Sequence, residues 1–139
     1  MDTPWMEVIE TMDLLISIKP QFADKILSGH KHFEYRKKIF QKPIDNIYIY
    51  SSFPAKKIVG KFKFSGYIEG SPEEIWTKTH EHSGISAKFF FSYYAGKKIA
   101  YAIKIVSLII FEVPVDPYIK NTAFRPPQSF MYVEKGFFG

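Results

Sequence analysis

Alternating side chains over short stretches most constrain the fold of this chain. Phe33 and Tyr35 alternate with Glu34 and Arg36, a period-two pattern typical of a β-strand with two chemically different faces. Similar alternation, or a buried apolar run, predicts strands at residues 12–18, 30–36, 47–52, 58–67, 98–113 and 130–133. The regular strand–helix alternation of a parallel sheet is absent. The pattern therefore predicts an α+β fold, a small, curved or partly closed mixed β-barrel with short flanking helices.

Three short helices are predicted from their start and stop signals. Pro20 opens the first helix at a position where its missing N–H has no cost, and Gly29 ends it. Ser71 and Glu74 are spaced as a capping box at the start of the second helix, and Ser86 caps the third. The chain has no linker or repeat, so we expect a single domain over residues 12–139 preceded by an N-terminal extension, residues 1–11.

The composition limits the classes of function. The chain has no cysteine, which excludes disulfides, thiolate catalysis and cysteine-ligated zinc. Its formal net charge of +5 favours a polyanionic partner, although a solvated basic surface is the simpler alternative. Cofactor-binding motifs are absent, so we expect no cofactor. Neither a secretion signal nor a stretch long enough to span a bilayer is present, so we expect a cytoplasmic protein with no membrane partner.

Several segments occur in the order of a known family signature. Residues 15–20 form a predicted strand that ends in Lys-Pro, residues 26–31 end a short helix in Gly-His-Lys, and residues 33–36 read Phe-Glu-Tyr-Arg. Later matching segments are residues 49–52, residues 59–62, a helix with Trp76, and residues 126–130. Together they resemble the ASCH domains of the PUA-like superfamily, over nearly the whole chain from Met12 onward.

The resemblance implies a small β-barrel, a cleft beside the first helix, and work on RNA. Some ASCH proteins are amidohydrolases that remove the acetyl group of 4-acetylcytidine. Others have been linked to RNA cleavage, and some act next to transcription or translation factors. The deacetylating members carry a threonine nucleophile three residues after the lysine that corresponds to Lys31. This chain has Glu34 at that position, so the same deacetylation route is not expected here.

Lys31, Glu34 and Arg36 are the central candidates for function. Lys31 would contact a phosphate or polarise a carbonyl, and the alternative is an exposed lysine that favours a helix C-terminus. Glu34 and Arg36 share one face of a strand. Glu34 would accept hydrogen bonds from a base edge, while Arg36 would bind phosphate or stack on a ring. The alternative for this pair is a structural ion pair.

Further candidates for RNA contact are basic, aromatic and hydroxyl-bearing. Lysines interleaved with tyrosines suit single-stranded RNA, because rings stack on bases while ammonium groups bind phosphates. A solvated edge that prevents aggregation and serines that cap turns are the structural alternatives. The full set is Lys19, Lys37, Lys38, Tyr50, Ser51, Ser52, Lys61, Lys63, Gln128 and Ser129.

Two histidine pairs invite a metal interpretation. His30 and His32 would point the same way on a strand, and His80 and His82 have the same spacing. Nothing in the sequence fixes a third ligand for either pair. We therefore expect surface histidines and no metal site.

Three functions remain open from the sequence. The first is an RNA-binding domain, non-catalytic or regulatory, with Lys31, Glu34 and Arg36 in its cleft. The second is an enzyme that acts on RNA or on a modified nucleoside, a ribonuclease or amidohydrolase with Lys31 and Glu34 as the acid and base. The third is a protein-interaction domain, for which no partner can be named.

Overall fold

A computed structural model describes residues 10–138, so most of the predicted N-terminal extension lies outside the described residues. Six strands form one mixed sheet in the order β2-β5-β4-β3-β1-β6. Only β1 and β3 are parallel, and every other neighbouring pair is antiparallel. The strands are β1 (Met12–Ile18), β2 (Phe33–Arg36), β3 (Ile44–Ser51), β4 (Lys57–Gly70), β5 (Ala100–Val115) and β6 (Phe130–Val133).

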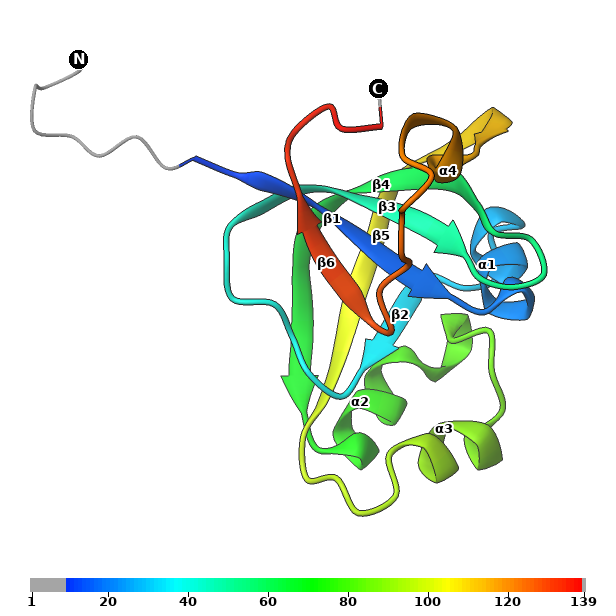
Figure 1. Ribbon diagram of the computed structural model, residues 1–139. Coiled ribbons are helices and arrows are strands. Elements are labelled where there is room, and N and C mark those ends of the chain that lie inside the picture. The colour runs from blue at the N-terminus through cyan, green and yellow to red at the C-terminus, as the bar shows by residue number, and fades with distance from the viewer. Residues whose placement is uncertain (1–9, 139) are drawn as a thin grey trace, which may run out of the picture.

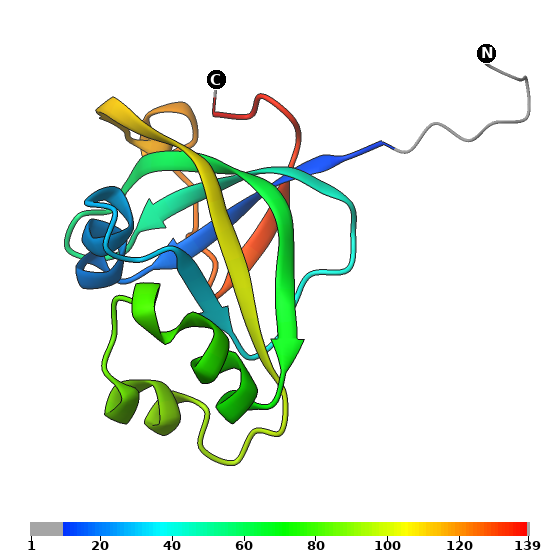
Figure 2. The same cartoon turned by 180° about the vertical axis from the view of Figure 1, so that it is seen from behind.

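The predicted α+β class and curved mixed sheet are confirmed. Figures 1 and 2 show long strands β4 and β5 bending along the molecule. The sheet does not close into a barrel, since β2 and β6 remain at its two edges. The predicted short strand near the C-terminus is β6, and it lies at an edge as expected.

Five helical segments complete the fold: α1 (Pro20–Leu27), α2 (Pro72–Thr79), η1 (His80–His82), α3 (Ala87–Tyr93) and α4 (Pro117–Lys120). The predicted caps are present. The Ser71 hydroxyl accepts a hydrogen bond from the Glu74 amide at 3.2 Å, and the Ser86 hydroxyl accepts one from the Phe89 amide at 3.1 Å. The α4 turn was not predicted. It starts at Asp116, whose carboxylate accepts a hydrogen bond from the Tyr118 amide.

The second predicted strand is shorter than its alternation suggests. The amides of His30 and Lys31 both donate to the carbonyl of Lys25, at 2.9 and 3.0 Å. Gly29 adopts a positive φ of 84° to make that turn after α1. Residues 30–32 therefore form the turn that follows α1, and β2 begins only at Phe33.

Apolar side chains cover both faces of the sheet. One cluster lies between α1 and the strands β1, β3 and β4, and another lies between α2, α3 and the strands β2 and β5. On β3, Tyr48 and Tyr50 are each only 1% exposed, and they pack with Phe124 and Phe138 near the C-terminus. Burial of these rings dominates the stability of this layer. Among residues 10–138, no helix combines the length and apolar character needed to cross a membrane.

Candidate functional site

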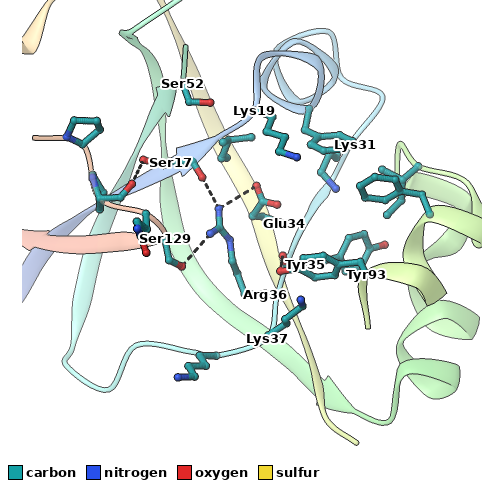
Figure 3. A pocket seen from close by; sticks show the side chains of 18 of the residues that line it. Ser17, Lys19, Lys31, Glu34, Tyr35, Arg36, Lys37, Ser52, Tyr93 and Ser129 are labelled. Atoms are coloured by element: carbon teal, nitrogen blue, oxygen red, sulfur yellow. Dashed lines mark hydrogen bonds and ion pairs between the residues drawn. The ribbon is translucent and has the colours of Figure 1, made fainter. Parts of the chain in front are cut away.

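A cleft of about 640 Å³ opens between α1, the strand β2, helix α3 and the segment of residues 126–129 (Figure 3). One carboxylate, Glu34, lies in this cleft among several cations. The basic residues that line it are Lys19, Lys31, Arg36, Lys37, Lys38 and Lys97. The cleft is therefore suited to an anionic ligand.

Lys31 is buried rather than exposed, with a relative exposure of 3%. Its Nζ atom donates to the Ser83 carbonyl at 3.1 Å and lies 4.5 Å from the centroid of the Tyr35 ring. Burial lowers the pKa of Lys31 to about 8, although the nearby Glu34 carboxylate acts in the opposite direction. The helix-end alternative, which requires an exposed lysine, is therefore wrong.

Glu34 and Arg36 point into the cleft from the same face of β2 (Figure 3). Arg36 Nη1 donates to the Ser129 hydroxyl at 3.1 Å, and Nη2 donates to the Ser17 carbonyl at 2.8 Å. Arg36 Nη2 and Glu34 Oε2 form an ion pair at 3.9 Å, which is too long for a hydrogen bond. Glu34 and Arg36 therefore form an ion pair. The hydrogen bonds to Ser17 and Ser129, rather than Glu34, fix the position of the guanidinium.

Two polar atoms in this pair are buried without a hydrogen-bond partner among the described residues. They are Glu34 Oε2, an acceptor, and Arg36 Nε, a donor. Glu34 is only 7% exposed. Because a buried polar atom without a partner is costly, native structures rarely retain one without a reason. A ligand with an N–H group offers Glu34 the missing partner.

The far wall of the cleft is attached to β1. The amide of Ser17 donates to the Ser129 carbonyl at 3.0 Å, and the Ser17 hydroxyl donates to the Pro127 carbonyl at 2.7 Å. These bonds hold Gln128 and Ser129 beside the cleft, although they lie more than a hundred residues from β1 in sequence. Both residues were predicted to contact the ligand.

Aromatic rings form the wall contributed by α1, β2 and α3. Phe22 and Phe89 pack with ring centroids 5.2 Å apart, and the Lys37 ammonium lies 4.5 Å from the centroid of the Tyr93 ring. Phe89 is 42% exposed, so its ring has a free surface. The sequence analysis did not single out Phe89, Tyr93 or Lys97 as cleft residues. Phe89 and Tyr93 are four residues apart on α3, and this spacing was the available signal for them. Lys97 lies beyond the end of the helix.

The predicted contact residues do not form one surface. Lys19, Lys31, Glu34, Arg36, Lys37, Lys38, Ser52, Gln128 and Ser129 line the cleft, whereas Tyr50, Ser51, Lys61 and Lys63 do not. Tyr50 and Ser51 are buried, at 1% and 3% exposure, so the expectation of stacking on Tyr50 is corrected. Lys63 pairs with Asp45 at 2.6 Å, away from the cleft.

The histidine pairs do not converge on a shared site. His30 shares a hydrogen bond with the Ser28 hydroxyl at 2.7 Å, while the His32 ring stacks on His82 at 4.5 Å between centroids. Residues 30–32 are outside β2, so the expected common direction of His30 and His32 does not apply. No group of three potential metal ligands occurs within residues 10–138.

This chain is similar to known proteins in sequence and in structure. No protein-family model matches the chain. An ASCH domain-containing ribonuclease from Zymomonas mobilis is 26% identical over 136 residues, which cover 93% of this chain and 89% of that protein. The crystal structure of ASCH from Zymomonas mobilis has a TM-score of 0.82 and 25% identity, over 91% of this chain and 90% of that chain. The chain is therefore similar to ASCH domains in both sequence and fold.

Another relative of this chain is a larger protein. The large ribosomal subunit protein uL22 of Ureaplasma parvum is 27% identical over 125 residues. The match covers 89% of this chain but only 40% of that ribosomal protein. The similarity therefore concerns one part of that protein.

Proposed function

We propose that this ASCH domain binds single-stranded RNA and takes one unstacked nucleotide into the cleft. The observation that carries the proposal is the buried Glu34 oxygen, which has no hydrogen-bond partner within residues 10–138 and lies among cations and rings. A cleft of about 640 Å³ is within the usual size of small-ligand sites. The similarity to a protein named as a ribonuclease supports RNA as the polyanion.

The cleft offers three kinds of contact that suit a nucleotide. The exposed ring of Phe89 supplies a surface on which a base can stack. The Glu34 carboxylate accepts a hydrogen bond from an exocyclic amino group, as carboxylates do from the amino group of cytosine. Lys37, Lys38 and Lys97, all exposed at the mouth of the cleft, bind phosphates. Arg36 already donates to Ser17 and Ser129, so it chiefly supports the wall of the cleft beside Glu34.

RNA cleavage is the second candidate, and the chemistry of Lys31 and Glu34 favours it. A lysine with a pKa of about 8 exchanges its proton near neutral pH, as an acid or base catalyst must. In such a step the ribose 2′-oxygen forms a bond to phosphorus while the bond from phosphorus to the 5′-oxygen breaks. Glu34 takes the 2′-hydroxyl proton, and Lys31 gives a proton to the leaving 5′-oxygen. The ribonuclease name of the relative from Zymomonas mobilis also supports it.

Replacement of Glu34 tests the binding proposal. Glu34→Gln keeps the size of the side chain but removes the charge that strengthens the hydrogen bond to the base. Loss of a charge-assisted hydrogen bond is worth about 1.5–3 kcal/mol. We expect the affinity for cytidine 5′-monophosphate, measured by calorimetry at low salt, to fall about tenfold or more.

Glu112→Gln is the matched control, because Glu112 is exposed on β5 and does not line the cleft. It should leave the affinity unchanged. Failure of the wild-type chain to bind either the nucleotide or short RNA at low salt would overturn the proposal.

Analysis of the RNA after incubation with the protein distinguishes the binding function from the cleavage function. A 2′,3′-cyclic phosphate product that is lost in Lys31→Ala identifies an enzyme, and intact RNA identifies a binding domain.

A further inference from the structure

Phe53 is an exposed aromatic residue that the cleft does not use. It lies in the turn between β3 and β4 and is 79% exposed, more than any other aromatic side chain in residues 10–138. Exposure of so large an apolar ring is unfavourable unless it contacts a partner. The residue before it, Ser52, lines the cleft, so Phe53 lies directly beside its rim.

A backbone hydrogen bond holds this turn against the end of β1, and a second one closes the turn itself. The Ser52 amide donates to the Ile18 carbonyl at 3.0 Å, and the Ala55 amide donates to the Ser52 carbonyl at 3.1 Å. Figures 1 and 2 both show the β3–β4 turn beside α1. The Phe53 ring is therefore presented from an anchored loop, which lowers the entropy lost when a ligand stacks on it.

Positive charge accompanies the ring. Lys19 follows Ile18 directly, is exposed and lines the cleft. Lys56, also exposed, lies in the same turn as Phe53. Within residues 10–138, neither lysine forms an ion pair with an acidic side chain. The Lys56 ammonium lies 5.2 Å from the centroid of the Tyr118 ring. Exposed rings and ammonium groups in the same region are what single-stranded nucleic acids contact in their binding proteins.

We propose that Phe53 forms a second subsite, where it stacks on the base of the nucleotide next to the one in the cleft. Lys19 binds the phosphate that joins the two nucleotides, and Lys56 binds the phosphate beyond. The inference rests on the proposed function, because the first nucleotide must occupy the cleft. It adds that the ligand is a strand of at least two nucleotides rather than a free nucleoside.

The test compares a ligand that reaches only the cleft with one that reaches both subsites. The probes are cytidine 5′-monophosphate and the trinucleotide ApCpA, measured by calorimetry at low salt. Stacking of one base is worth about 1–3 kcal/mol, so Phe53→Ala should weaken trinucleotide binding about 5- to 150-fold. The affinity for the mononucleotide should stay unchanged, and Phe53→Trp should keep the trinucleotide affinity.

Ile119→Ala is the matched control, since Ile119 is 81% exposed on α4 and does not line the cleft. A trinucleotide with 2-aminopurine in place of one adenine reports which neighbour stacks, because its fluorescence is quenched on stacking. Equal trinucleotide affinity in wild type and Phe53→Ala overturns this inference alone. Equal losses of affinity for the mononucleotide and the trinucleotide in Phe53→Ala also overturn it. Phe53 would then support the shape of the cleft rather than bind a second base. A wild-type chain that binds neither probe overturns both proposals.

Discussion

The burial of Lys31 has a cost that function can explain. The residue is only 3% exposed, and this burial lowers its pKa to about 8. One hydrogen bond to Ser83 and the Tyr35 ring are its main protein contacts. Residues that bind or transform a ligand commonly reduce the stability of the free protein. Lys31 is therefore expected to be a residue whose removal strengthens the fold.

The first prediction is that Lys31→Met raises the free energy of unfolding by about 1–3 kcal/mol at pH 7. The folded-state pKa of Lys31 is about 8, below its ordinary value of 10.5, so between these two pH values the unfolded chain binds more protons than the folded chain. Wild-type stability from this group consequently rises with pH between about 8 and the ordinary lysine pKa. The advantage of the variant should shrink over the same interval.

Urea unfolding of both proteins at a series of pH values measures this difference. The comparison between the two chains cancels the titration of the other groups that both contain. A variant that is less stable at every pH, or a difference that does not change with pH, would contradict the prediction. Loss of RNA binding in the same variant would show that stability and binding oppose each other at this residue.

At the scale of elements, the loop after η1 determines where Lys31 can lie. Gly84 has a φ of 70°, and a Cβ atom added there would lie 2.8 Å from Lys31 Cβ. That distance is shorter than real side chains tolerate. The loop and Lys31 are therefore packed as one unit, and the Ser83 carbonyl is held within reach of the ammonium group.

The second prediction follows from this packing. Gly84→Ala should displace Lys31 and weaken RNA binding, in addition to the cost of a positive φ, about 1–2 kcal/mol. Gly96→Ala is the matched control, because Gly96 has a φ of 78° and nothing within 4 Å of the added atom. Thermal unfolding and RNA affinity of both variants separate the two effects. Similar RNA affinities would show that the contact with Lys31 has no consequence for the site.

The local elements could be predicted because their signals are local. Pro20 begins α1, and Ser71 and Ser86 cap α2 and α3, as the sequence indicated. Alternation identified the strands, but it gave no information on partners. The parallel pairing of β1 with β3 depends on contacts between distant segments, and no short pattern encodes it.

The site was predictable only in part for the same reason. Lys31, Glu34 and Arg36 lie within six residues of one another, and the family signature singled them out. The burial of Lys31 depends on Ser83, which is 52 residues away. Phe89 and Tyr93 reach the cleft only because α3 packs beside β2. The sequence around the motif therefore does not indicate which distant residues tertiary packing brings to the cleft.

At the scale of the whole molecule, the net charge of +5 is distributed unevenly. Lys37 and Lys38 are exposed at the mouth of the cleft. Lys61 and Lys63 lie on β4 outside the cleft, and Lys63 is neutralised by Asp45. Since RNA binding releases counterions in proportion to the phosphates contacted, these two lysine pairs should differ in their effect on salt dependence.

The final prediction compares two double variants with the same loss of charge. The logarithm of the affinity for single-stranded RNA should fall linearly with the logarithm of salt concentration, by about 0.7 for each phosphate contact. Lys37→Ala with Lys38→Ala should make this slope shallower by about 1.4, because two contacts are lost. Lys61→Ala with Lys63→Ala should leave the slope close to that of the wild type. Fluorescence anisotropy over a salt series measures both. Equal slopes in the two variants would mean that the overall charge, rather than the cleft, attracts RNA, and the path of the strand would then have to lie elsewhere.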